Sequence, residues 1–157
     1  MEKFIIVAGS PNSGKTITTN ITINKLIDNG FTVADYFNDK SSKDFWTVMS
    51  KNGVQYGKGG SVVLEKNAKK VVIISYGDSL EWLKIVFDEI NFNDYYAVIC
   101  CSHATKGKDI FNFFHKIIGT IDLNKTQVIP IFKNLLSRHN NDNQENEYVA
   151  NFIVSLL

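Results

Sequence analysis

Arginine is almost absent from this sequence, in which Arg138 is the single example among 157 residues. Arginine is the side chain best suited to bind guanine edges and phosphate groups through two hydrogen bonds at once. Its scarcity therefore disfavours a protein that reads a DNA sequence. The formal net charge of +1 argues neither way, because a basic patch can hide in a balanced total. We expect no nucleic-acid partner.

Cysteine is also scarce, and its two examples, Cys100 and Cys101, are adjacent. Neighbouring residues on an extended strand point to opposite faces, which disfavours a disulfide between these two cysteines. The spacing of the two cysteines also matches no zinc site. Reduced thiols are typical of the cytoplasm. No apolar run approaches the roughly 18 residues of a membrane span, and the first residues do not have the pattern of a signal peptide. We therefore expect a cytoplasmic protein without a membrane partner, folded as a single domain over residues 1–157.

Short apolar runs alternate with amphipathic stretches along the chain. The runs are rich in β-branched residues and lack the alternation of a half-exposed strand, so they predict strands buried on both faces. We expect these strands at residues 4–8, 31–37, 70–75, 95–101 and 127–132. Apolar residues at helical spacing predict helices at residues 15–29, 78–90, 109–118 and 142–156. Strands separated by such helices form a parallel sheet covered on both faces, so the sequence predicts an α/β protein with three layers, αβα.

Several residues mark where the predicted helices begin and end. Gly30 and Gly119 can adopt the left-handed conformation that terminates a helix, so we expect them to end the first and third helices. Asp142 and Glu145 have the spacing of a capping box at the start of the last helix. The apolar stripe of that last helix is predicted to comprise Tyr148, Val149, Phe152, Ile153 and Leu156.

Pro130 lies inside the fifth predicted strand. Because proline cannot donate a hydrogen bond to a neighbouring strand, its position predicts that this strand lies at an edge of the sheet. The stretch at residues 40–69 has a strong turn signal at Asn52-Gly53 and a short apolar run at residues 61–64. We expect a hairpin inserted beside the third strand, with a helix as the alternative.

Eight consecutive residues after the first predicted strand match the pattern G-x-x-x-x-G-K-[ST] at every position. They are Gly9, Ser10, Pro11, Asn12, Ser13, Gly14, Lys15 and Thr16. The two glycines let the backbone approach a phosphate group, and the N–H groups of the loop can then point inward as an anion nest. Lys15 can reach the β- and γ-phosphates as a point charge, and Thr16 can place its hydroxyl on Mg²⁺. The following helix adds partial positive charge at its N-terminus.

Through this motif, set between an apolar strand and a helix, the chain resembles the P-loop nucleoside triphosphate hydrolase superfamily. The resemblance is close over the motif and loose over the α/β alternation of the whole chain. It implies ATP with Mg²⁺ as the ligand, with GTP as a weaker alternative, and Lys15 as a catalytic residue. The kinase-like branch of the superfamily implies a mainly parallel sheet of five strands in the order 2-3-1-4-5, which also leaves the strand of Pro130 at an edge.

The acidic residues of the site are less clearly marked than the loop. P-loop enzymes commonly place an acid at the end of a neighbouring strand to hold the metal and its water shell, but Ser75 stands there in this chain. Asp78 is the first acid beyond it and the candidate for the catalytic and metal-side carboxylate, with a helix N-cap as the alternative. Asp39, and after it Asp35, lies near the end of the second strand, where small-molecule kinases often carry a base. The alternative for both is a solvated acid in a polar loop.

Polar residues also follow the fourth and fifth predicted strands, at the sheet edge where open α/β folds bind ligands. His103 and Lys106 follow the fourth strand, and we expect His103 to be a partly exposed loop residue. Lys133 and Arg138 follow the fifth strand. The resemblance implies that Arg138 contacts the nucleotide, at its base or at the transferring phosphate, and the alternative is a solvated cation.

Three functions fit this pattern. The first is an ATP-dependent phosphotransferase similar to small-molecule, nucleoside or nucleotide kinases, and the single arginine favours an acceptor that carries no phosphate. The second is a slow regulatory ATPase that switches through a protein partner. The third is a nucleotide-binding module whose catalysis has decayed. The sequence leaves open the partner beyond the nucleoside triphosphate, which is a small-molecule acceptor in the first case and a protein in the second.

Overall fold

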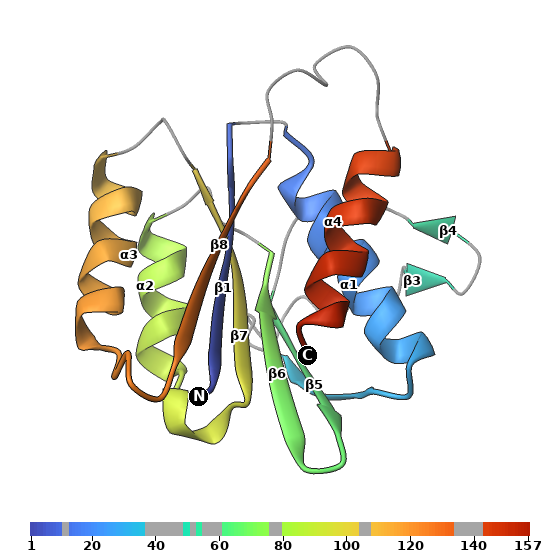
Figure 1. Ribbon diagram of the computed structural model, residues 1–157, viewed down its shortest axis with the longest axis horizontal. Coiled ribbons are helices and arrows are strands. Elements are labelled where there is room, and N and C mark those ends of the chain that lie inside the picture. The colour runs from blue at the N-terminus through green and yellow to red at the C-terminus, as the bar shows by residue number, and fades with distance from the viewer. Residues whose placement is uncertain are drawn as a thin grey trace.

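The computed structural model describes residues 1–10, 13–36, 49–50, 53–54, 61–75, 80–103, 108–133 and 143–157. These residues form a six-stranded sheet with helices on both of its faces (Figure 1). Helices α1 (Lys15–Asp28) and α4 (Asn143–Ser155) cover one face, and helices α2 (Leu80–Glu89) and α3 (Lys108–Thr120) cover the other. The expected α/β class is therefore confirmed. No helix in the described ranges has both the length and the apolarity to cross a lipid bilayer.

The sheet has the strand order β2-β5-β6-β7-β1-β8. Its strands are β1 (Lys3–Gly9), β2 (Thr32–Tyr36), β5 (Ser61–Lys66), β6 (Lys69–Ile74), β7 (Ala97–His103) and β8 (Gln127–Phe132). The pairs β6–β7, β7–β1 and β1–β8 are parallel, whereas β5 pairs antiparallel with both β2 and β6. The sheet is therefore mixed and has one strand more than the five expected.

The expected order 2-3-1-4-5 is wrong, because the fourth predicted strand, β7, lies between the third, β6, and the first, β1. All of Ala97–Cys101 in β7 are fully buried, as are Phe4 and Ile5 of β1. Both strands therefore carry the unbroken apolar run of a strand buried on two faces. Such a run shows that a strand is internal but does not reveal which strand lies beside it.

The run at residues 61–64 is part of a strand, β5, that forms a hairpin with β6, whereas the expected hairpin lay within residues 40–69 and did not include the third strand itself. The antiparallel register of β5 and β6 runs from Ser61–Ile74 to Lys66–Lys69, and the two residues between them, Asn67 and Ala68, both have positive φ, 50° and 63°. Two consecutive left-handed residues are the geometry of a tight hairpin turn. The first strand of the hairpin, β5, also joins β2, which accounts for the sixth strand. A separate two-stranded sheet pairs β3 (Met49–Ser50) with β4 (Gly53–Val54), so Gly53 of the expected turn lies in a strand, while Asn52 lies outside the described residues.

Pro130 lies at the edge of the sheet, as predicted. In the described residues β8 pairs with β1 alone, and Pro130 is in register with Ile6. Its missing N–H therefore removes no hydrogen bond from the interior of the sheet.

Two apolar clusters hold the helices to the sheet. On the α2–α3 face, Phe4 of β1 packs edge-on against Phe87 of α2, with ring centroids 6.4 Å apart, and Phe87 packs in the same way against Phe114 of α3 at 5.9 Å. On the other face, Ile23 and Leu26 of α1 and Ile153 of α4 pack against the sheet. Leu83, Phe87 and Ile90 of the α2 segment are buried on the α2–α3 face of the sheet.

The ends and faces of the helices agree only in part with the sequence analysis. Gly30 has φ +88° directly after α1, as predicted, whereas α3 continues through Gly119 to Thr120. In α4 the buried residues are Asn146, Ala150 and Ile153, while Tyr148 and Phe152 are 75% and 45% exposed. The predicted stripe is therefore wrong for its two aromatic residues. Asp142, the expected cap of α4, lies outside the described residues.

Candidate functional site

The eight-residue motif lies where the carboxyl end of β1 meets the start of α1, at the top of Figure 1. We refer to residues 9–16 as the 9–16 loop. The ends of two other strands flank it, because Gly9 is in register with His103 of β7 and Ala8 with Phe132 of β8. Directly after β8, the Lys133 N–H donates a 2.8 Å hydrogen bond to the carbonyl of Ala8.

Both glycines of the motif are required sterically in this structure. A Cβ on Gly9 would lie 2.4 Å from Ser13 Oγ, and a Cβ on Gly14 would lie 2.5 Å from Asn146 Oδ1. Gly14 also has φ +80°, a left-handed conformation that glycine adopts without strain. The backbone therefore turns here with no room for a larger residue.

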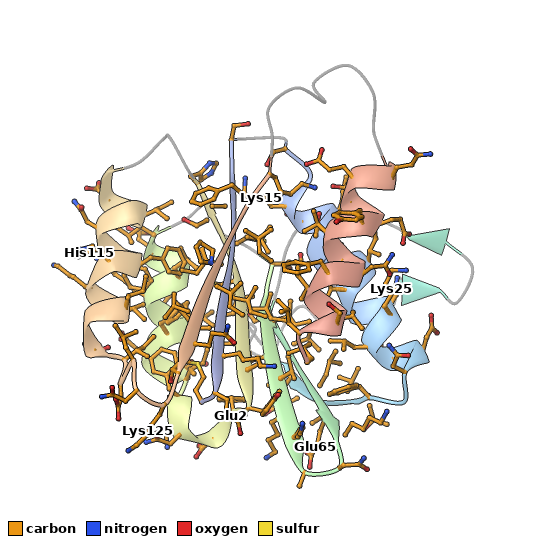
Figure 2. The ribbon with its side chains drawn as sticks, in the orientation of Figure 1. Glu2, Lys15, Lys25, Glu65, His115 and Lys125 are labelled. Carbon is orange, nitrogen blue, oxygen red and sulfur yellow. The ribbon has the colours of Figure 1, made fainter. Side chains whose placement is uncertain are left out.

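Lys15 folds back over the loop. Its Nζ donates hydrogen bonds to Ser10 O at 2.8 Å and to Gly9 O at 3.2 Å, and the residue is 7% exposed. Figure 2 shows Lys15 at the upper end of α1, whereas Glu2, Glu65 and Lys125 lie at the opposite edge of the sheet. An ammonium group therefore lies directly against the loop backbone.

The start of α1 presents uncompensated positive charge. Its N-cap residue is Gly14, no side chain caps it among the residues that the structure describes, and its first turn holds no acid. The Ser13 hydroxyl is buried beside it, and Ser13 Oγ has no hydrogen-bond partner in the described residues. A buried hydroxyl without a partner and an uncapped helix N-terminus both favour an acceptor group at this position.

A buried polar network supports the loop from behind. Lys133 is 5% exposed, and its Nζ donates to Thr18 Oγ1 at 2.8 Å and to Asn146 Oδ1, which also accepts a 3.1 Å bond from the Thr18 hydroxyl. Burial lowers the pKa of Lys133, Glu145 opposes that shift, and Lys15 adds to it. Two lysine ammonium groups therefore act on each other beside the 9–16 loop.

The network contains one residue that the sequence analysis missed, Asn146. Nothing in its sequence context distinguishes it from the polar residues around it. It is buried because α4 packs along α1, which brings Asn146 against Gly14 and Thr18. Lys133, a candidate from its place after the fifth strand, does lie at the loop.

Thr16 points toward the end of β6. Its hydroxyl donates a 3.3 Å hydrogen bond to the carbonyl of Ser75, the residue that directly follows β6. Ser75 is 1% exposed. The structure therefore brings together Thr16 and the strand end at which the sequence analysis sought a carboxylate.

Several candidates from the sequence lie outside the described residues, namely Pro11, Asn12, Asp39, Asp78, Lys106 and Arg138. Asp35 is described, and it is exposed on β2. Across the sheet, Asp35 is level with Phe4 of β1, through the successive pairs with Val63, Val72 and Val98. Phe4 precedes Gly9 by five residues, which is roughly 16 Å along the strand. The structure therefore does not bring Asp35 to the 9–16 loop.

His103 is the last residue of β7, half-buried, and thus not the loop residue that we expected. Its neighbour Ser102 is 5% exposed, and the Ser102 hydroxyl donates a 3.3 Å hydrogen bond to the carbonyl of His103. Both residues lie beside the start of the 9–16 loop, because β7 pairs directly with β1.

These features describe a site suited to anionic oxygen atoms. It combines the N-terminus of a helix, a backbone turn without side-chain bulk, a buried hydroxyl and two lysines. Comparisons with protein-family models, with curated proteins and with solved structures find no match to the chain.

Proposed function

We propose that the chain binds ATP with Mg²⁺ through a P-loop at residues 9–16 and transfers the γ-phosphoryl group. The observation that carries this proposal is the geometry of the described residues of the 9–16 loop, where Gly9 and Gly14 leave no space for a Cβ and Lys15 Nζ lies against the carbonyls of Gly9 and Ser10. Because Gly9 and Gly14 carry no side chain, a phosphate group can approach the backbone at both ends of the loop, where the N-terminus of α1 favours an anion. GTP is the alternative nucleotide.

In this proposal the ligand takes over the contacts that Lys15 now makes within the loop. The ammonium exchanges its bonds to Gly9 O and Ser10 O for the β- and γ-phosphates, which are stronger acceptors because they are charged. The buried Ser13 hydroxyl supplies a further donor. Lys133 adds positive charge behind the loop without leaving its network.

Mg²⁺ fits this site through Thr16. A hydroxyl oxygen is a ligand type that Mg²⁺ accepts, and the ion is held mainly by phosphates and water in such sites. When bound, the ion neutralises charge that develops on the phosphates. Asp78 follows Ser75 by three residues, and we propose it as the metal-side carboxylate, with Asp39 as the base and Arg138 as a nucleotide contact.

The first candidate reaction is phosphoryl transfer to the hydroxyl of a small molecule. The second is hydrolysis, in which water attacks the γ-phosphorus and releases ADP and phosphate, with the energy used through a protein partner. One observation favours hydrolysis: β7 pairs directly with β1, which places Ser102 and His103 beside the start of the 9–16 loop. Polar side chains there can orient a water molecule by hydrogen bonds.

Calorimetry with Mg-ATP tests the proposed binding. We expect Lys15→Ala to weaken affinity at least roughly tenfold, because it removes the point charge on the β- and γ-phosphates. The matched control is Lys25→Ala on the same helix, since Lys25 pairs with Glu147 at 2.8 Å, away from the loop (Figure 2). Equal affinities for the two variants, or no binding by the unaltered protein, would reject the proposal.

A coupled assay then separates the two reactions. ADP formed without an added acceptor indicates hydrolysis, whereas ADP that appears only with one member of a panel of nucleosides, nucleotides and sugars indicates a phosphotransferase. Binding without turnover in either arm would show that the chain only binds the nucleotide.

A further inference from the structure

Lys133 is a buried lysine whose hydrogen-bond partners carry no charge. Its Nζ donates to Thr18 Oγ1 at 2.8 Å and to Asn146 Oδ1, and both of these side chains are neutral. Lysine is almost never fully buried unless it is paired with a charge of opposite sign. No carboxylate among the described residues forms an ion pair with Lys133, although Glu145 attracts its ammonium from α4. The positive charge of Lys133 is therefore not neutralised by a direct contact.

Asn146 stands where a carboxylate would be the stronger partner for this lysine. It is 6% exposed, and its Oδ1 accepts hydrogen bonds from Lys133 Nζ and, at 3.1 Å, from the Thr18 hydroxyl. An aspartate has nearly the same shape and could accept the same two hydrogen bonds, and the bond from Lys133 would then join two opposite charges. The amide of Asn146 therefore provides the hydrogen bonds without removing the charge.

Asn146 also lies directly against the 9–16 loop. A Cβ on Gly14 would lie 2.5 Å from Asn146 Oδ1 and 3.1 Å from Asn146 Nδ2. Gly14 is the N-cap of α1, and the buried hydroxyl of Ser13 beside it has no hydrogen-bond partner in the described residues. A carboxylate at position 146 would place negative charge beside the helix end that favours an anion, whereas the neutral amide does not.

We propose that Asn146 is a positioning residue of the phosphate site, which holds Lys133 behind Gly14 and, being neutral, leaves the Lys133 charge to act on the bound anion. The attraction between this charge and a ligand grows with the ligand charge, so the pair favours a nucleoside triphosphate over a diphosphate. Because the ammonium is buried, salt screens its charge less than that of a surface lysine. This inference rests on the proposed function and adds to it a residue pair that selects for ligand charge.

Asn146→Asp separates the charge of this residue from its shape. Calorimetry with ATP and with ADP, both in the presence of a chelator, keeps the charge of the two ligands different. We expect the affinity for ATP to fall at least roughly tenfold and the affinity for ADP to fall less, because ADP carries less negative charge. The midpoint of urea unfolding should stay the same or rise, since the variant keeps both hydrogen bonds. The matched control is Asn151→Asp, which adds the same charge at an exposed position of α4 and should change either affinity by less than roughly twofold.

Lys133→Gln tests the other member of the pair. Glutamine removes the charge and keeps an N–H donor for the neutral oxygens of the network. The affinity for ATP should again fall more than the affinity for ADP, because the lost attraction scales with ligand charge. The matched control is Lys125→Gln, since the Lys125 side chain is 82% exposed and lies at the opposite edge of the sheet (Figure 2). Circular dichroism would verify that each variant is folded, and Lys133→Gln decides the question if Asn146→Asp does not fold.

The outcomes distinguish this inference from the proposed function. If the unaltered protein binds neither ATP nor ADP, nucleotide binding is rejected and the inference falls with it. If the unaltered protein binds ATP and the Asn146→Asp and Lys133→Gln variants bind it as tightly as their controls, only the inference is rejected. Equal losses for ATP and ADP would also overturn it, because they would show that Asn146 acts through the shape of the loop alone.

Discussion

Lys133 Nζ donates a 2.8 Å hydrogen bond to Thr18 Oγ1, which joins the residue after β8 to the first turn of α1. Asn146 of α4 accepts hydrogen bonds from both residues. Three segments that are far apart in the sequence therefore meet behind the 9–16 loop. Because the ammonium is buried, its protonation is linked to folding.

The stability of the protein should depend on pH through Lys133. Burial lowers the pKa of this lysine below its ordinary value of 10.5, so the folded state binds the proton less tightly than the unfolded state. Between the lowered pKa and 10.5 the unfolded state holds more protons, and stability rises with pH in that window. Urea unfolding of the protein and of Lys133→Met from pH 7 to 10.5 should show a difference that grows in favour of the unaltered protein. A difference independent of pH would contradict the lowered pKa.

Replacing Gly14 or Gly119 by alanine should change the free energy of unfolding in opposite directions. Gly14→Ala forces a Cβ into Asn146 at φ +80°, and we expect a loss of about 1–3 kcal/mol in the free energy of unfolding. Gly119→Ala is the matched control, because it lies within α3 and its Cβ would meet no atom within 4 Å. Alanine there should stabilise the protein by about 0.5–1 kcal/mol. Denaturant unfolding measures both, and equal effects would reject the steric role of Gly14.

The local features of the fold could be predicted from the sequence because their causes are local. The apolar run before Gly9, the helical spacing after Lys15 and the missing donor of Pro130 each constrain their own segment. The strand at residues 61–64 was predicted for the same reason, and it pairs with the strand that follows it in the sequence.

The missed features depend on contacts between distant segments. β6, β7 and β1 are similarly apolar, so the sequence could not show that β7 lies between β6 and β1. Asp35 was a candidate because it lies near the end of the second strand, whereas its register across the sheet leads to Phe4 and not to Gly9. Asn146 is a polar residue whose burial is possible because Thr18 and Lys133 satisfy its side-chain oxygen.

The hydroxyl of Thr16 should determine how strongly Mg²⁺ promotes nucleotide binding, if the proposed function is right. Thr16→Val removes the proposed ligand and should abolish most of the gain in ATP affinity that Mg²⁺ gives, while leaving metal-free affinity within about threefold. Thr22→Val is the matched control, since its hydroxyl donates to Thr18 O within α1 at 2.8 Å. Calorimetry with and without Mg²⁺ makes the comparison. An unchanged Mg²⁺ effect in Thr16→Val would remove Thr16 from the metal site.

The observed face of α4 can be tested against the one predicted from its sequence. Ile153 is fully buried, so Ile153→Ala should lower the free energy of unfolding by about 2–5 kcal/mol through lost burial and the cavity left behind. Tyr148 is 75% exposed, so Tyr148→Ala should change it by less than about 0.5 kcal/mol. The predicted stripe would instead make both residues core positions with comparable losses. Chemical unfolding of the two variants distinguishes the alternatives, because a large loss for Tyr148→Ala is incompatible with an α4 that presents Asn146, Ala150 and Ile153 to the sheet and α1.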